Sequence, residues 1–204
     1  MTASLMSGNE KPAGERRENP IRTFVCIEIA DAVKNQIADL QCELKQIDAH
    51  VSWVKPANIH LTLKFLGPVE PSRIAAVREA VARATSSCRP FEVEVSGTGC
   101  FPSARSPRIL WVGLSQVPNQ LQQLHQTMED EFAREGFARE QKLFSPHLTI
   151  GRIRSPRGAR ESAEKLINSG FTGLTFRATE VIVMRSDLSP TGSLYTRLAL
   201  IQLG

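Results

Sequence analysis

The chain has 204 residues, with 25 Lys and Arg against 21 Asp and Glu, and therefore a formal net charge of +4. Hydrophobic residues make up 41% and charged residues 23%, which is typical of a globular protein and excludes a disordered, collagenous or coiled-coil chain. No apolar run approaches the roughly 18 residues that a transmembrane helix needs. The small basic excess permits a polyanionic partner but does not require one.

The N-terminal segment differs from the rest. Residues 1–20 hold several Gly and Pro and almost no apolar residues after Met6, which predicts a disordered tail. The segment lacks the apolar core of a signal peptide. We therefore expect one folded domain over residues 21–204.

The first half of that domain alternates predicted strands and helices. Short β-rich or alternating segments indicate the strands, and apolar residues recurring every three or four positions indicate the helices. Asp31 is expected to cap the first helix. The expected elements are a strand at 21–30, a helix at 33–47, a short strand at 51–54, a strand at 59–66, a helix at 71–84 and a strand at 91–101.

The second half repeats this order. Its expected elements are a strand at 108–115, a helix at 121–132, a strand at 147–153, a helix at 157–168 and closing strands at 172–187 and 193–202. An offset of 87 residues relates the halves: it aligns Phe24 with Trp111 and the HLT at 60–62 with the HLT at 147–149.

The repeat predicts how the domain is organised. Identity outside the HLT match is weak, so we infer the repeat, about 21–107 and 108–204, from order and spacing. Two such halves predict an α+β fold of two pseudo-symmetric lobes around a central cleft. The sequence leaves open whether strands cross between the lobes.

The four cysteines, Cys26, Cys42, Cys88 and Cys100, form no CxxC pair. A zinc knuckle or a redox motif is therefore not indicated. Three of them fall on predicted strands or helices, which suits small buried hydrophobic residues, and we expect a reduced, cytosolic protein.

The two HLT segments carry the candidate chemistry. Residues two apart on a strand share a face, so His60 and Thr62 point one way while Leu61 points to the core; His147 and Thr149 do the same. One imidazole can accept a proton from water and the other can donate one to a leaving oxygen. The threonine hydroxyls can donate to phosphate oxygens that gain charge.

This pattern predicts phosphodiester hydrolysis without a metal. Neither motif contains Asp or Glu, and no third histidine lies at ligand spacing, so a zinc or magnesium site is not expected. A single His-x-Thr on a strand is weak support, because such residues are often structural. Two copies related by the repeat favour the catalytic interpretation.

The longer motifs resemble those of a known family. HLTLKFLG at 60–67 and PHLTIGR at 146–152 resemble the paired H-x-T motifs of the 2H phosphoesterase superfamily. WVKPANIHLTLKFLG from Trp53, RILWVGLS from Arg108 and RSDLSPTGSLYTRLAL from Arg185 are similar to its bacterial and archaeal RNA 2′,3′-cyclic phosphodiesterase branch, also called the 2′-5′ RNA ligase family. The resemblance covers about 21–203.

The resemblance implies antiparallel sheets flanking the cleft and helices outside. It implies hydrolysis of a terminal 2′,3′-cyclic phosphate to a 2′-phosphate, with His60 as proton donor and His147 as proton acceptor, although the two-fold symmetry leaves the reverse roles open. It further implies a reverse 2′-5′ ligation without ATP.

The partners that it implies are RNA with a 2′,3′-cyclic phosphate end, with tRNA fragments as candidates, and no membrane, metal or cofactor. A monomer is expected. Two alternatives stay open: a 2H enzyme for another small cyclic phosphate or a 2′-5′ oligonucleotide, and a non-catalytic module that binds RNA ends.

Residues after the motifs are harder to assign. Arg152 matches the family's second-motif arginine, a phosphate clamp, but strict alternation puts it opposite His147 unless Gly151 permits a bulge. The equivalent Phe65 is expected in the core rather than on a base-stacking surface. Strict alternation puts Lys64 on the His60 face, and the sequence leaves open whether its ammonium contacts phosphate or solvent.

Several other residues are weaker candidates. His50 and His125 are expected on the surface, and Trp53 is expected to pack rather than stack on bases. Tyr195 is a candidate for base stacking. A set of arginines is a candidate for contact with an RNA backbone or is simply solvated: Arg105, Arg108, Arg154, Arg157 and Arg160.

Overall fold

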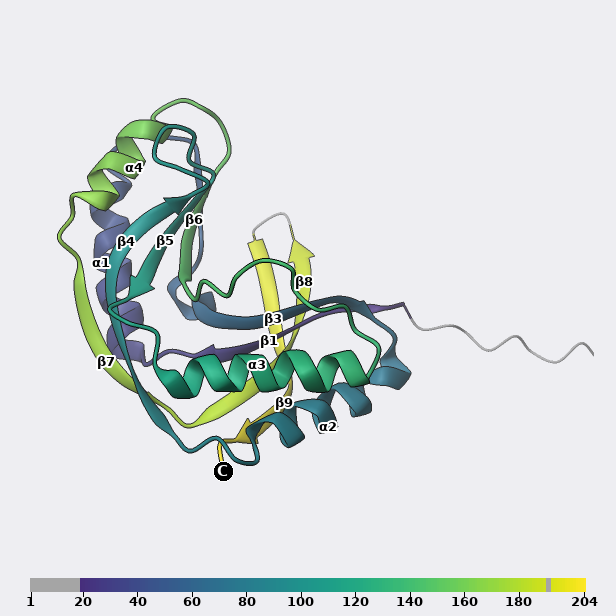
Figure 1. Ribbon diagram of the computed structural model, residues 1–204. Helices are drawn as coiled ribbons and strands as arrows, with labels where there is room; N and C mark the ends of the chain where they lie inside the picture. Colours follow the sequence, from purple (N-terminus) through teal and green to yellow (C-terminus); the bar gives the residue numbers. More distant parts are fainter. Residues whose placement is uncertain (1–18, 190–191) are drawn as a thin grey trace, which may run out of the picture.

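Two antiparallel sheets, each covered by helices on one face, make up the protein (Figure 1). The computed structural model describes residues 19–189 and 192–204; the predicted tail lies outside this part of the chain except for its last two residues. The strands are β1 (Ile21–Glu28), β2 (Val51–Trp53), β3 (His60–Val69), β4 (Phe91–Phe101), β5 (Ile109–Leu114), β6 (Leu148–Ile153), β7 (Thr172–Ala178), β8 (Glu180–Ser189) and β9 (Gly192–Gln202).

The helices follow the predicted positions. They are α1 (Asp31–Leu44), α2 (Ile74–Thr85), α3 (Asn119–Arg134) and α4 (Ala159–Ile167), with short 3₁₀ turns η1 (Pro56–Asn58) and η2 (Pro71–Arg73). Asp31 is the first residue of α1 rather than its cap, and its carboxylate pairs with Lys34 instead. The predicted α+β fold class, with antiparallel sheets and outer helices, is confirmed.

Each sheet takes strands from both halves of the chain. The four-stranded sheet has the order β3-β1-β8-β9, and the five-stranded sheet has the order β2-β6-β5-β4-β7. In the four-stranded sheet, β3 and β1 of the first half lie next to β8 of the second half. In the five-stranded sheet, the equivalent strands β6 and β5 of the second half lie next to β4 of the first half. The two halves therefore exchange β4 and β8. Strand crossing, which the sequence left open, is thus part of the architecture, while the extent of the repeat stays a prediction.

The exchange changes one predicted element. The segment predicted as a closing strand at 172–187 is interrupted at Thr179. Its first part, β7, lies at the edge of the five-stranded sheet, and its second part, β8, lies inside the four-stranded sheet. Hydrophobic alternation continues through both parts, so the sequence pattern does not reveal the change of sheet.

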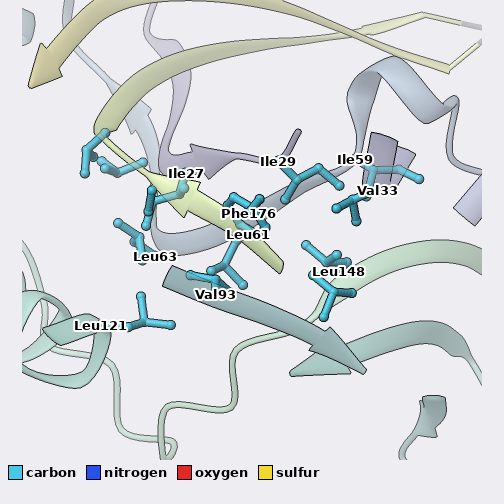
Figure 2. Close-up of a cluster of buried hydrophobic side chains, with 14 of the residues drawn as sticks. Ile27, Ile29, Val33, Ile59, Leu61, Leu63, Val93, Leu121, Leu148 and Phe176 are labelled. Atoms are coloured by element: carbon cyan, nitrogen blue, oxygen red, sulfur yellow. The ribbon is translucent and has the colours of Figure 1, made fainter. Parts of the chain in front are cut away.

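The helices are also shared between the halves. Helices α1 and α4 contact β7 and β4 of the five-stranded sheet, while α2 contacts β8 and β9 and packs against α3 (Figure 1). The side chains between these layers form one continuous hydrophobic core, part of which is drawn in Figure 2. Leu61 and Leu148, the central residues of the two HLT segments, are fully buried in it, as predicted.

Cysteine burial differs from the expectation. Cys26 is fully buried between the sheet strands, where burial raises the pKa of its thiol, but Cys42 on α1 is exposed. Cys88 and Cys100 are partly buried. All four are free thiols, so only one of them behaves as a core hydrophobic residue.

Both motif strands contain a β-bulge at equivalent positions. In β3, Cys26 pairs with Thr62 and Val25 with Lys64, so Leu63 is the extra residue. In β6, Trp111 pairs with Thr149 and Leu110 with Gly151, so Ile150 is extra. A bulge of one residue reverses the faces of the residues that directly follow it, which are Lys64 and Phe65 in β3 and Gly151 and Arg152 in β6.

The bulge in β3 turns Lys64 away from His60. Its ammonium lies 2.6 Å from the Glu129 carboxylate of α3 and donates to the Ala138 carbonyl at 3.0 Å. Both side chains of the ion pair are less than a tenth exposed, at 5% and 7%. The two outcomes that the sequence left open for Lys64, phosphate and solvent, are therefore both wrong: it forms a buried ion pair.

The pair also controls the charge of Glu129. Burial opposes ionisation, but the Lys64 ammonium and the Glu140 backbone N–H, which donates at 2.9 Å, outweigh it and hold the pKa of Glu129 below its ordinary value. This contribution to stability is complete above the ordinary pKa of a glutamate and is lost as the pH falls through the lowered one.

Replacing Lys64→Met should therefore destabilise the protein strongly. The buried Glu129 carboxylate would lose its cation, and removing one partner of a buried pair typically costs about 3–5 kcal/mol. Urea unfolding at neutral pH measures the loss. The control Lys34→Met removes the pair with exposed Asp31 and should change the free energy of unfolding by about 1 kcal/mol or less. Equal losses in the two variants would contradict this account.

Candidate active site

One cleft, with a volume of about 590 Å³, lies between the two sheets. All five residues predicted as the site line it: His60, Thr62, His147, Thr149 and Arg152. Strand β3 carries the first two and β6 carries Thr149 and Arg152, while His147 directly precedes β6; the two strands contact each other where the sheets meet. The fold therefore brings the two distant HLT segments to one site.

The two histidines are held in the same way. The Nδ1 of His60 lies 2.8 Å from the Asn58 carbonyl oxygen, and the Nδ1 of His147 lies 2.7 Å from the Ser145 carbonyl oxygen. A carbonyl can only accept, so each Nδ1 carries its proton and donates. This leaves the Nε2 of each ring as the nitrogen available for proton transfer.

Aromatic rings pack against each imidazole. The His60 ring stacks on Phe24 at a centroid distance of 4.7 Å and meets the edge of Tyr195 at 5.4 Å. The His147 ring meets the edge of Phe101 at 5.0 Å. These contacts, together with the backbone hydrogen bonds, fix the ring orientation on both sides of the cleft.

The surroundings lower the pKa of both histidines. For His60, burial lowers the pKa and the Arg152 charge adds to this, whereas the Asn58 hydrogen bond and the Glu28 carboxylate oppose it. For His147, burial lowers the pKa and Arg152 adds to it, whereas the hydrogen bond to Ser145 opposes it. The Arg152 charge thus lowers the pKa of both imidazoles, whereas a carboxylate, that of Glu28, raises the pKa of His60 alone.

The two threonines are half-buried beside the histidines. Within the part of the chain that the structure describes, neither hydroxyl of Thr62 and Thr149 has a hydrogen-bond partner. Both are therefore available as donors to a ligand in the cleft.

Arg152 reaches the cleft because of the bulge at Ile150. The bulge puts Arg152 on the His147 face, where it pairs in register with Ile109. The bulged Ile150 carbonyl accepts hydrogen bonds from the buried Gln41 side chain at 2.8 Å and from the Val54 N–H at 3.0 Å. Helix α1 and the chain after β2 thus hold the bulge in shape.

Gly151 has a different role from the one expected. Its backbone lies outside the left-handed region, but a Cβ there would come within 2.9 Å of Val51 and 3.1 Å of Trp53. The glycine therefore lets β2 pack closely onto β6. Trp53 both packs there and lines the cleft.

The prediction for Phe65 is wrong. Its side chain is 64% exposed and lines the cleft rather than the core. The bulge at Leu63 returns Phe65 to the His60 face, as the bulge at Ile150 does for Arg152. Phe65 and the predicted Tyr195 thus present aromatic surface to the cleft from the four-stranded sheet.

The cleft is positively charged. Its described lining includes four cationic side chains, Arg22, Lys55, Arg152 and Arg154, and contains no Asp or Glu. Such a lining favours an anionic ligand. Among the residues that the structure describes, no group of three or more His, Cys, Asp or Glu side chains lies close enough to hold a metal ion.

Sequence reasoning missed several residues that shape the site. Asn58 holds His60 through its carbonyl and donates its side-chain amide to the Ser193 carbonyl of β9 at 2.8 Å. Glu28 is paired in register with His60. The signal for Glu28 is a single acidic residue inside the otherwise apolar run that ends the predicted strand at 21–30, and the alignment of Phe24 with Trp111 is the signal for the aromatic packing.

The other histidines lie elsewhere. His50 is exposed, as predicted. The prediction for His125 is wrong: its ring stacks on Phe144 at a centroid distance of 3.8 Å and is largely buried. Neither histidine is part of the cleft lining that the structure describes.

Comparison with known proteins decides the family. The 2′-5′ RNA ligase superfamily matches residues 28–190. The chain belongs to this superfamily. The match confirms the family predicted from the paired motifs and, with it, the predicted class of enzyme, a phosphoric diester hydrolase.

Curated superfamily members resemble the whole domain. An RNA 2′,3′-cyclic phosphodiesterase of Methanothermobacter thermautotrophicus is 32% identical over 185 residues, covering 90% of this chain and 99% of that protein. An RNA 2′,3′-cyclic phosphodiesterase of Thermotoga maritima is 34% identical over 180 residues, covering 86% of this chain and 91% of the relative.

Solved structures share the superfamily fold. TT0787 of Thermus thermophilus superposes with a TM-score of 0.75 at 22% identity, covering 90% of this chain and 98% of that one. LigT of E. coli, solved in complex with 3′-AMP, superposes with a TM-score of 0.73 at 24% identity with the same coverage. In the described part of the chain, no helix is both long and apolar enough to cross a membrane.

Replacing Arg152→Ala should raise the pKa of both His60 and His147. The guanidinium charge disfavours both imidazolium ions, so its removal makes protonation easier at each ring. NMR titration of the imidazole signals measures the two values. The control Arg22→Ala removes another cleft arginine, one that does not contribute to either shift, and should leave both values unchanged. A rise at only one ring would show that Arg152 does not lie between them.

Proposed function

We propose that the protein hydrolyses the 2′,3′-cyclic phosphate at the end of an RNA strand to a 2′-phosphate, without a metal or cofactor. One observation carries the proposal. Two histidines, each with Nδ1 fixed on a backbone carbonyl, line a single cationic cleft that has no carboxylate in its described lining. The curated relatives named RNA 2′,3′-cyclic phosphodiesterases support the choice of substrate.

The reaction needs one proton acceptor and one proton donor. The Nε2 of His147 takes a proton from water as the water oxygen attacks phosphorus. The bond from phosphorus to the ribose 3′ oxygen breaks, and the protonated Nε2 of His60 gives its proton to that oxygen. The products are a 2′-phosphate and a 3′-hydroxyl, and the exchange of protons is paired general acid and base catalysis.

The remaining site residues stabilise charge. As phosphorus becomes five-coordinate, its non-bridging oxygens gain negative charge. The hydroxyls of Thr62 and Thr149 donate to these oxygens, and Arg152 offers a fork of N–H donors. Because Arg152 also disfavours a second imidazolium, it helps to keep one histidine neutral.

Glu28 supports the assignment of His60 as the acid. The two rings share burial, a backbone hydrogen bond and the influence of Arg152, but only His60 has a carboxylate that favours its protonated form. A nearby carboxylate stabilises the imidazolium that a general acid must hold before it donates, which supports His60 as the acid and leaves His147 as the base.

The proposal also covers the reverse reaction, the substrates, the oligomeric state and the cellular compartment. The same site run in reverse joins a cyclic phosphate end to a 5′-hydroxyl through a 2′-5′ bond, with no ATP. tRNA fragments with cyclic phosphate ends are candidate substrates, the protein acts as a monomer, and its four free cysteines suit the reducing cytoplasm.

Replacing either catalytic histidine should abolish most of the activity. His60→Ala and His147→Ala should each reduce kcat by at least roughly 10²-fold, the usual loss for a general acid or base. The assay follows a nucleoside 2′,3′-cyclic phosphate and its 2′-phosphate product in the presence of EDTA. His50→Ala, which changes an exposed histidine, should keep full activity.

Two results would overturn the proposal. Full activity in either His60→Ala or His147→Ala would rule out the paired mechanism. Loss of wild-type activity in EDTA would show that a metal takes part. Turnover of other small cyclic phosphates but not of RNA ends would favour a related 2H substrate.

Replacing Glu28→Gln should distinguish the acid from the base. Without the carboxylate the pKa of His60 falls, so the alkaline limb of the bell-shaped profile of kcat/KM, which reports the acid, should move to lower pH. Arg197→Gln is the control, because it removes the Glu28 partner at 3.1 Å but keeps the carboxylate. A shift of the acidic limb in Glu28→Gln would assign His60 as the base.

A further inference from the structure

A second pocket lies beside the cleft and is rich in arginine. Its volume is about 540 Å³. Arg105 and Arg108 come from the loop between β4 and β5, Arg154 follows β6, and Arg160 lies in the first turn of α4. Figure 1 shows that loop next to α4, and the Nε of Arg160 donates to the Arg105 carbonyl at 3.1 Å.

The four guanidinium groups are not neutralised by carboxylates. Within the described residues none of Arg105, Arg108, Arg154 and Arg160 makes an ion pair, whereas neighbouring Arg157 pairs with Asp48. One carboxylate, that of Glu161, also lines the pocket. Four cations against one anion in a concave site concentrate a positive potential that a bound anion would neutralise.

The composition of the pocket favours phosphate over a nucleobase. Its described lining contains no Phe, Tyr, Trp or His, so no ring is present on which a base could stack. Arginine donors arranged around a cavity instead match the oxygens of a phosphate group.

The pocket adjoins the cleft. Arg154 lines both, and next to it the Ile153 N–H donates to the Arg108 carbonyl at 2.9 Å. At about 3.3 Å per residue, the stretch of chain from His147 to Arg154 spans at most about 23 Å. A mononucleotide bound between the histidines does not extend that far, whereas a strand of several nucleotides does.

We propose that this arginine pocket binds a backbone phosphate of the same RNA strand whose cyclic phosphate end reacts between His60 and His147. The proposal rests on the proposed function and adds to it a second contact with the RNA strand, which a mononucleotide does not reach. Sequence-independent phosphate contacts of this kind bind any RNA end, and their strength falls with salt.

The test compares two substrates in the double variant Arg108→Gln/Arg160→Gln, whose changed residues lie outside the cleft lining. We expect kcat/KM for an eight-nucleotide RNA with a cyclic phosphate end to fall about tenfold or more, through KM, at low salt. The kcat/KM for a nucleoside 2′,3′-cyclic phosphate should not change. Arg157→Gln, which removes one neighbouring guanidinium that is already paired with Asp48, should leave both substrates unaffected.

Two further measurements test the same pocket: the dependence of kcat/KM on RNA length and the dependence of affinity on salt. In the wild type, kcat/KM should rise with RNA length until the strand reaches the pocket, and this rise should be absent in the double variant. The slope of log affinity against log salt for the long RNA should decrease in magnitude by about 0.7 for each phosphate that the variant no longer binds. Equal losses on both substrates, no loss on either, or the same loss in Arg157→Gln would overturn the proposal.

A binding measurement separates this proposal from the proposed function. Fluorescence anisotropy with a labelled eight-nucleotide RNA ending in a 2′-phosphate requires no turnover. If the wild type hydrolyses neither substrate, the proposed function fails, yet weaker binding by Arg108→Gln/Arg160→Gln than by Arg157→Gln still supports the pocket. Unchanged binding in the double variant rules the pocket out. Competition by inorganic phosphate alone at equal potency would show a free-anion site instead.

Discussion

The site depends on one interruption of the strand period. Along β3 and β6 the alternation of faces buries Leu61 and Leu148 and points each His-x-Thr pair into the cleft. One extra residue, Leu63 or Ile150, then reverses the alternation. Without the bulges, the residues two places further on would turn into the core, and the cleft would lose both a guanidinium and an aromatic ring.

The two sheets compensate for their bulges with different chemistry. In the five-stranded sheet, the amide of buried Gln41 satisfies the carbonyl of the bulged residue, and Gly151 admits β2 without a clash. In the four-stranded sheet, the residue after the bulge is Lys64, which turns toward the helices and requires the Glu129 carboxylate. A buried polar group is tolerated only where such a partner exists, so α1 and α3 maintain the geometry of strands whose opposite face lines the cleft.

Much of this arrangement could be predicted from the sequence, because its signals are local. The elements, the HLT pairs and the buried leucines follow from periodicity and from the repeat. Strict alternation predicts the wrong face for Lys64 and Phe65, because it ignores in β3 the kind of bulge that Gly151 suggests at the aligned position of β6. Applying the offset to the bulge as well would have corrected both residues.

Other features depend on contacts between distant segments, which periodicity does not record. The exchange of β4 and β8 and the division of the 172–187 segment between two sheets are choices of strand partner, and the strands themselves have similar patterns in either sheet. The exchange nevertheless explains why the lobes cannot separate: each sheet needs strands from both halves, and one core joins them. The pseudo-symmetry is broken just after the two bulges, because β3 presents the aromatic ring of Phe65 to the cleft where β6 presents the guanidinium of Arg152.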